Sequence, residues 1–225
     1  MNAKQNARRI ASARLRAFRA SPTAPAYPAH SLFTAQTAYQ RARTVFFYAP
    51  LPLEIDPYAL AYTAENAGKH VALPRVSGND LHFHAVTYAC TPHPSVSCFT
   101  TLCPRTRGIR EPDAHSPRLY PPHPSPNTPA QRTLALPLLI VVPALAFSTN
   151  GARLGRGGGH YDRFLARIAA TIPAGSYYTL GLCFDCQIMA VIPQEAHDQS
   201  VHAVLTETRL ISCATARAPA PPFSL

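Results

Sequence analysis

The sequence predicts an α/β fold: a single domain with a mostly parallel sheet flanked by helices, three-layered and Rossmann-like. Segments typical of strands alternate with segments of helical periodicity, and this alternation favours a parallel sheet. An apolar segment at 134–147 is followed by a glycine-rich loop and then by a helical pattern, which gives the order strand, loop, helix. The chain has 225 residues, enough for one domain (1–225) with a substantial core.

The first third of the chain contains three predicted helices and three predicted strands. A β-branched and aromatic run marks the first strand, and Gly68 is a plausible helix stop. Glu54 is expected to begin the third helix, where a carboxylate is favoured by the helix dipole. In chain order, the helices are expected at about 2–20, 31–43 and 54–68, and the strands at 44–50, 69–76 and 81–86.

The composition shifts at 90–132, where prolines are frequent and hydrophobic periodicity disappears. We interpret 115–128 as a proline-rich surface loop. The helical pattern after the glycine-rich loop is followed by a strand-like run at 177–189, and the tail at 216–225 is expected to be flexible.

The glycine-rich loop is the strongest functional signal. Gly155, Gly157, Gly158 and Gly159 precede a predicted helix N-terminus, and arginines lie within the same stretch. Glycines allow backbone N–H groups to approach an anion, a helix N-terminus adds partial positive charge, and arginines bind phosphate oxygens. The pattern therefore favours a polyphosphate site over a plain flexible loop, although it matches neither the Rossmann nor the Walker glycine motif.

The composition of the chain narrows the classes of molecule that it can bind. The net charge of +10 suits an anion, either a nucleic acid or a small polyanion. Nucleic acid is the weaker prediction, because aromatic and basic residues are not interleaved. No apolar run is long enough to span a membrane, and we see no secretory signal, so we expect a cytoplasmic protein. The six cysteines are expected to be reduced and mostly structural.

The basic segment at 2–20 allows three interpretations. It has the arginine-rich, acid-poor character of a transit peptide, and it also fits a solvated surface helix. A third possibility is that it belongs to the functional site. Lys4 and Arg8 lie one helical turn apart and can reach the same phosphates.

Taken together, the motifs resemble those of the 5-formyltetrahydrofolate cyclo-ligase family, also called methenyltetrahydrofolate synthetases. The string RLGRGGGHYDR at 153–163 closely resembles the ATP-site signature of that family, and the K-x-x-x-R pair near the start matches its first helix. LPR at 73–75, GIREP at 108–112, HD at 197–198 and TE at 206–207 are similar to further family elements, in the same order.

The resemblance implies roles for individual residues. Arg153 and Arg156 are implied as catalytic, Asp162 as the magnesium ligand, and His202 and Asp198 as two further candidate ligands. His202 stands where the family has an acidic residue, and histidine is a poor ligand for Mg²⁺. Residues implied in binding the folate are Ala49, Glu54, Arg75 and Tyr161. Those implied in binding ATP are Lys4, Arg8, Arg153, Leu154, Gly155, Arg156, Gly157, Gly158, Gly159, His160 and Tyr161.

The implied reaction is the cyclisation of 5-formyltetrahydrofolate to 5,10-methenyltetrahydrofolate, with ATP as co-substrate and Mg²⁺ as cofactor. We expect a monomer that takes these small molecules as partners. Two alternatives stay open: a folate- and ATP-binding homologue with weakened catalysis, motivated by His202, and a basic RNA-binding protein.

Overall fold

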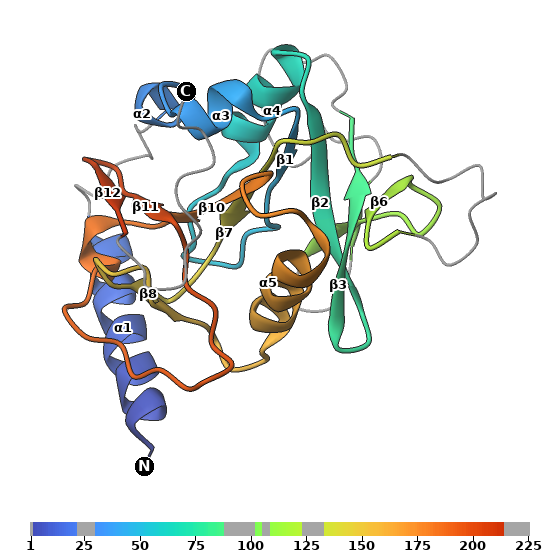
Figure 1. The fold of residues 1–225 in the computed structure, drawn as a ribbon. Coiled ribbons are helices and arrows are strands. Elements are labelled where there is room, and N and C mark those ends of the chain that lie inside the picture. Colours follow the sequence, from blue (N-terminus) through green and yellow to red (C-terminus); the bar gives the residue numbers. More distant parts are fainter. Residues whose placement is uncertain (1, 22–29, 88–101, 105–108, 123–132, 214–225) are drawn as a thin grey trace.

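A computed structural model describes residues 2–21, 30–87, 102–104, 109–122 and 133–213. Its centre is an eight-stranded sheet, which Figure 1 shows flanked by helices. In spatial order the strands are β12 (Leu210–Ser212), β11 (Ala203–Leu205), β10 (Tyr177–Leu182), β7 (Leu138–Val142), β1 (Thr44–Phe46), β2 (His70–Ser77), β3 (Asp80–Ala85) and β6 (Arg118–Tyr120).

The five middle strands, from β11 to β2, are parallel. Val45 of β1 is in register with Val71 of β2 on one side and with Leu139 of β7 on the other. Strands β12 and β3 run antiparallel to their neighbours, and β6 continues the sheet beyond β3. The predicted mostly parallel sheet is therefore confirmed.

The two faces of the sheet contribute to two hydrophobic clusters, because side chains alternate along each strand. Val45 and Val141 pack with residues of α1 (Ala3–Ala20), α2 (His30–Thr34), α3 (Thr37–Arg41) and α4 (Tyr58–Asn66). Phe46 and Ile140 point to the opposite face, where they join residues of α5 (His160–Thr171). Helices cover both faces, which gives the three layers that the sequence predicted.

The chain order creates a switch point between β1 and β7. From β1 the chain continues through α4 to β2 on one side, whereas β7, α5 and β10 extend the sheet on the other side. Ligand sites in open α/β sheets form at the carboxyl ends of strands next to such a point. The short hairpin of β8 (Ala146–Phe147) and β9 (Arg153–Leu154), which leads into the glycine-rich loop, follows this end of β7.

Several predicted boundaries were wrong. The helix expected at about 31–43 is two short helices, α2 and α3. The helix expected from Glu54 begins only at Tyr58, after Pro57, where Asp56 Oδ1 accepts a hydrogen bond of 2.8 Å from the Tyr58 N–H. Its predicted end is confirmed, since Gly68 follows it with a φ of 76°.

The proline-rich region is also more ordered than predicted. Within the expected loop at 115–128, β6 adds an edge strand to the main sheet. Earlier in the region, β4 (Leu102–Pro104) pairs with β5 (Arg110–Pro112) in a small antiparallel sheet. The rest of the predicted loop, at 123–128, and the predicted flexible tail at 216–225 lie outside the described residues.

The N-terminal segment folds as helix α1 against the rest of the chain. Asn2 caps it by accepting a 2.8 Å hydrogen bond from the Lys4 N–H. Ala7, Ala11 and Leu15 are buried along one face. This packing supports the interpretation in which the basic segment belongs to the functional part of the protein.

Close packing at Gly181 of β10 gives a test of the fold. A Cβ at this position would lie 2.6 Å from Cε1 of the buried Phe147 ring. We expect Gly181→Ala to lower the free energy of unfolding by about 1–3 kcal/mol, measured by urea denaturation. In a Phe147→Leu background, where the ring is absent, the same substitution should cost less than about 1 kcal/mol. An equal cost in both backgrounds would contradict this packing.

Candidate functional site

A cavity of about 850 Å³ lies at the carboxyl ends of β1, β2 and β7, next to the switch point. Its lining comes from α1, from the segments after these strands, from the glycine-rich loop and from the 195–198 segment. The lining residues are Asn2, Lys4, Arg8, Tyr48, Ala49, Leu51, Glu54, Pro74, Arg75, Val76, Leu81, Ile109, Glu111, Pro143, Ala144, Arg153, Leu154, Gly155, Arg156, Gly157, Gly158, Gly159, His160, Tyr161, Asp162, Glu195, His197 and Asp198.

The glycine-rich loop joins β9 to the N-terminus of α5. Gly159 is the N-cap residue of α5 and has a φ of 66°, in the left-handed region that favours glycine. A Cβ there would also lie 2.6 Å from Nη1 of Arg163. The left-handed turn into the helix therefore favours glycine at this position, and it leaves the N–H groups of the first helical turn at the cavity.

A buried ion pair closes the loop at its base. Nη2 of Arg153 lies 2.7 Å from Oδ1 of Asp162, and the two side chains are only 3% and 16% exposed. The Gln199 N–H donates to the same carboxylate oxygen at 3.2 Å. The guanidinium also lies over the ring of Tyr161, at 5.7 Å from its centroid. Arg153 and Asp162 thus join β9, α5 and the loop before β11.

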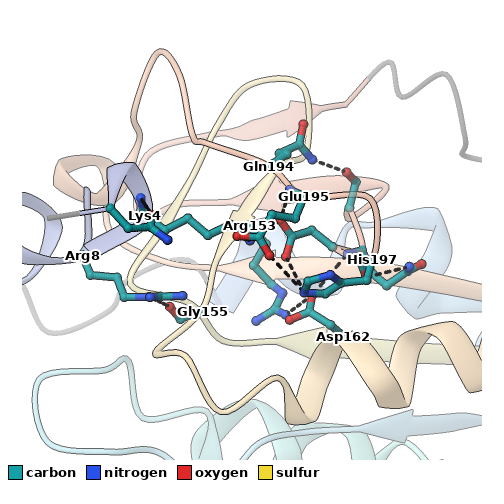
Figure 2. Close-up of polar contacts among 12 residues, drawn as sticks. Lys4, Arg8, Arg153, Gly155, Asp162, Gln194, Glu195 and His197 are labelled. Atoms are coloured by element: carbon teal, nitrogen blue, oxygen red, sulfur yellow. Dashed lines mark hydrogen bonds and ion pairs between the residues drawn. The ribbon is translucent and has the colours of Figure 1, made fainter. Parts of the chain in front are cut away.

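Helix α1 places two cations at the other side of the loop (Figure 2). Lys4 Nζ lies 2.6 Å from Oδ2 of Asp198 and 3.3 Å from Oε1 of Glu195. Arg8 Nε donates to the Gly155 carbonyl at 2.9 Å. The predicted pair one helical turn apart therefore reaches the glycine-rich loop and the 195–198 segment together.

The Asp198 carboxylate is held ionised at this position. Partial burial opposes its charge, but the hydrogen bonds from Lys4 and from the Glu195 N–H outweigh it, so the pKa of Asp198 is lowered. A charged carboxylate beside Lys4 keeps that ammonium fixed at the cavity.

Glu54 lies in the loop after β1 and faces the cavity. Its Oε1 is 3.0 Å from Nη2 of Arg156, and its Oε2 accepts a 2.9 Å hydrogen bond from the Leu51 N–H. Burial raises the pKa of Glu54, although the Leu51 and Arg156 contacts act in the opposite direction. The neighbouring Leu53 has a φ of 76°, which is strained for a leucine. Glu54 directly follows this residue, and its carboxylate pairs with Arg156.

Arg75 and Glu111 contribute from β2 and β5. Nη1 of Arg75 donates to the Pro112 carbonyl at 2.9 Å, and the Val76 N–H donates to Oε1 of Glu111 at 3.3 Å. These contacts hold residues 109–112 of the GIREP segment beside the cavity, which Ile109 and Glu111 line. Ala49, directly after β1, lines the same part.

His202 lies elsewhere. It is not among the described residues that line the cavity, and its ring stacks on Tyr178 at 4.8 Å. Its Nδ1 accepts a hydrogen bond of 3.1 Å from the Thr179 N–H, so the neutral ring carries its proton on Nε2. Burial lowers the pKa of His202 to about 4. With its one lone pair already in use, this histidine has no nitrogen to offer a metal.

All the other residues singled out from the sequence line this one cavity; their individual roles remain predictions. The sequence analysis did not single out Glu195. Its position three residues before Asp198 could have indicated it as a second acidic partner for the predicted cation Lys4. Nothing local in the sequence indicated Tyr48 or Pro143, which line the cavity only because β1 and β7 are neighbours in the sheet.

The carboxylates in the cavity suit a hard cation such as Mg²⁺ only if phosphate oxygens and water supply the other ligands. Within the described residues, no group of three or more His, Cys, Asp or Glu side chains could hold a metal ion. Asp162 lines the cavity at the loop, and its Oδ1 accepts the bonds from Arg153 and Gln199. Its second oxygen fits a Mg²⁺ ion that takes its remaining ligands from phosphates and water, as Mg²⁺ usually does.

Three comparisons with known proteins agree. Residues 1–207 match the model of the 5-formyltetrahydrofolate cyclo-ligase family. A 5-formyltetrahydrofolate cyclo-ligase of Mycolicibacterium smegmatis is 35% identical over 167 residues, covering 74% of this chain and 75% of that protein. The mouse 5-formyltetrahydrofolate cyclo-ligase is 44% identical over a shorter stretch of 69 residues, 31% of this chain and 34% of that protein.

Solved structures share the fold. The 5,10-methenyltetrahydrofolate synthetase of Aquifex aeolicus aligns with a TM-score of 0.65 at 22% identity, covering 96% of this chain and 95% of that one. The corresponding protein of Mycoplasma pneumoniae gives a TM-score of 0.57 at 16% identity, covering 91% and 98%. No helix among the described residues is long and apolar enough to cross a membrane.

The burial of His202 predicts how stability changes with pH. In the unfolded chain its pKa has the ordinary value of 6.5, whereas in the folded protein it is about 4. The stability that comes from keeping this ring neutral is therefore fully present above pH 6.5 and is lost as the pH falls towards 4. The loss from this group is at most about 3 kcal/mol.

Denaturation by urea at pH 7 and pH 4.5 tests this expectation. Asn at position 202 keeps an acceptor for the Thr179 N–H but does not titrate, so His202→Asn should lose less stability between the two pH values than the wild type. Equal losses in the two proteins would contradict the buried, neutral histidine.

Proposed function

Because the chain belongs to the 5-formyltetrahydrofolate cyclo-ligase family, we propose that it is an enzyme that cyclises 5-formyltetrahydrofolate to 5,10-methenyltetrahydrofolate with ATP and Mg²⁺. The observation that carries the proposal is the cavity itself. One part of its lining combines a glycine-rich loop, a helix N-terminus and the basic side chains of Lys4, Arg8, Arg153 and Arg156, and another part combines the buried carboxylate of Glu54 with apolar residues. The first part suits a polyphosphate, and the second suits a ring system with hydrogen-bond donors.

The polyphosphate end is proposed to bind ATP. The first-turn N–H groups of α5 favour an anion, and Lys4, Arg8 and Arg153 approach from α1 and β9. In the structure these cations contact carboxylates or a carbonyl, which keeps them in place. Phosphate oxygens are stronger acceptors for a guanidinium than a backbone carbonyl, so ATP can take over contacts such as that of Arg8 with Gly155.

The other end is proposed to bind the reduced folate. Ala49, Leu51, Val76 and Ile109 offer apolar contacts for its rings. The carboxylate of Glu54, only 7% exposed, can accept hydrogen bonds from ring N–H groups. Arg156 lies between the two ends, since it contacts Glu54 while belonging to the phosphate loop.

The proposed chemistry explains why ATP is needed. Cyclisation requires N10 of the folate to attack the formyl carbon at N5 and to expel the formyl oxygen, which is a poor leaving group. Transfer of the γ-phosphoryl group to that oxygen, with release of ADP, converts it into a phosphate ester. N10 then adds to the carbon and gives up its proton to solvent. The C–O bond breaks next, so that inorganic phosphate leaves with the oxygen and the carbon remains as the methenyl bridge between N5 and N10. Arg153 and Arg156 would stabilise the charge on the transferring group.

Asp162 is the residue we propose to hold Mg²⁺. Bound there, the ion would neutralise charge on the phosphate oxygens. Arg153 fixes the orientation of this carboxylate through Oδ1. Asp198 is engaged by Lys4, and His202 lies away from the cavity, so neither is part of this proposal.

The alternative of a catalytically weakened homologue rested on His202. Since His202 does not line the cavity among the described residues, its presence leaves the proposed catalytic groups unchanged. RNA binding finds no specific support either, because Arg153 and Arg156 of the glycine-rich loop are paired with the carboxylates of Asp162 and Glu54.

Absorbance in the methenyl-folate band tests the function directly. The signal is expected to appear only when protein, 5-formyltetrahydrofolate, ATP and Mg²⁺ are all present. Arg153→Ala and Asp162→Ala should each lower kcat by about 100-fold or more, by analogy with loss of other transition-state charge contacts. The matched control is Arg209→Ala, at an exposed position outside the cavity lining, which should leave the rate unchanged. Folded wild-type protein that binds ATP but gives no signal would overturn the assignment.

Glu54 allows the two ends of the cavity to be tested separately. Glu54→Gln keeps the shape of the side chain and an oxygen that can still accept from Arg156, but it removes the charge. KM for the folate should therefore rise about tenfold, and KM for ATP, whose proposed loop carries Arg156, should rise less. Glu65→Gln on α4, outside the cavity lining, is the control. A larger rise in KM for ATP than for the folate would contradict the proposed placement of the folate.

A further inference from the structure

We propose that Arg163 is a positioning residue that fixes the glycine-rich loop against the turn between β2 and β3. The inference rests on the proposed function in one respect, that this loop binds the phosphates of ATP. Arg163 is exposed on the first turns of α5, and its guanidinium contacts the Gly78–Asn79 turn.

One backbone carbonyl of the turn receives several bonds from α5. Nε and Nη2 of Arg163 lie 2.9 and 2.7 Å from the Asn79 oxygen, and Nδ1 of His160 lies 3.1 Å from it. In the tautomer with its proton on Nδ1, His160 donates to the same carbonyl as Arg163; in the other tautomer its Nδ1 accepts from Nη2 of Arg163 at 3.4 Å.

The same guanidinium also reaches the loop. Nη2 of Arg163 donates to the Gly158 carbonyl at 2.9 Å, and a Cβ on Gly159 would lie 2.6 Å from its Nη1. One planar group thus connects Gly158 with Asn79, and a side chain at position 159 would displace the guanidinium. If the guanidinium is removed, the loop loses a fixed contact next to the N–H groups that face the cavity.

The consequence reaches both parts of the cavity lining. The β2–β3 turn ends the hairpin whose β2 strand carries Pro74, Arg75 and Val76 into the cavity lining. Figure 1 shows this hairpin beside α5. Arg163 therefore sets the position of the proposed phosphate loop relative to the strand that lines the folate end.

Arg167 provides a matched comparison one helical turn further along α5. Its Nη2 lies 2.6 Å from Oδ1 of Asp80, so it joins the same helix to the same hairpin, and neither residue lines the cavity. Exposed pairs of this kind contribute little to stability. If Arg163 acted only as a tether between helix and hairpin, loss of Arg163 and loss of Arg167 would have similar effects.

Binding of a non-hydrolysable ATP analogue with Mg²⁺, measured by calorimetry, tests the inference. Arg163→Ala is expected to raise the Kd by about tenfold, the loss of one or two charge-assisted hydrogen bonds that fix the loop. Arg163→Lys, which can reach only one of the two carbonyls, should give an intermediate Kd. Arg167→Ala should stay within about twofold of the wild type. Equal Kd values for Arg163→Ala and wild type, or for Arg163→Ala and Arg167→Ala, would overturn the proposal.

A measurement without nucleotide separates this inference from the proposed function. In ¹⁵N–¹H NMR spectra of the ligand-free protein, Arg163→Ala should shift or broaden the amide signals of Gly155–Gly159, and Arg167→Ala should not. If the wild type fails to bind the analogue but this difference is seen, the proposed ATP site is wrong and the positioning of the loop stands. If the wild type binds but its loop signals are unchanged by Arg163→Ala, the positioning role is wrong.

Discussion

A buried arginine needs a fixed negative partner, and the pairing of Arg153 with Asp162 is the constraint on which the site depends. The two residues stand at opposite ends of the glycine-rich loop, one in β9 and one in the first turn of α5. The desolvation of both charges is offset only if their geometry is kept. The pair therefore fixes the span of the loop, and glycines with positive φ at 157 and 159 let the backbone cover that span.

Two other cations that line the cavity are also paired with carboxylates. Lys4 is held by Asp198, and Arg156 by Glu54, so each cation that could meet a phosphate is already oriented. Such preorganisation lowers the cost of ordering these side chains when a ligand binds. It also joins segments far apart in the chain: α1 contacts the 195–198 segment, and the loop after β1 contacts the loop before α5.

Much of this arrangement could be predicted from the sequence. Periodicity indicated the parallel sheet, and the spacing of Lys4 and Arg8 placed both on one face of α1. The position of Glu54 could not be read correctly, because it lies in a turn with a positive φ at Leu53 and α4 begins only at Tyr58, whose N–H donates to Asp56. Motif alignment made His202 a candidate ligand, but only the packing of Tyr178 and Thr179 around it reveals a core histidine. β6 was hidden among prolines because an edge strand with few partners leaves little pattern in the sequence.

The central claim is that the cavity couples phosphoryl transfer from ATP to loss of the formyl oxygen. The most direct measurement uses 5-formyltetrahydrofolate labelled with ¹⁸O in the formyl group and analyses the released phosphate by mass spectrometry. The account predicts one ¹⁸O atom in each phosphate formed together with methenyltetrahydrofolate. Unlabelled phosphate, with the label recovered in water, would show that the oxygen leaves without being phosphorylated and would contradict the account.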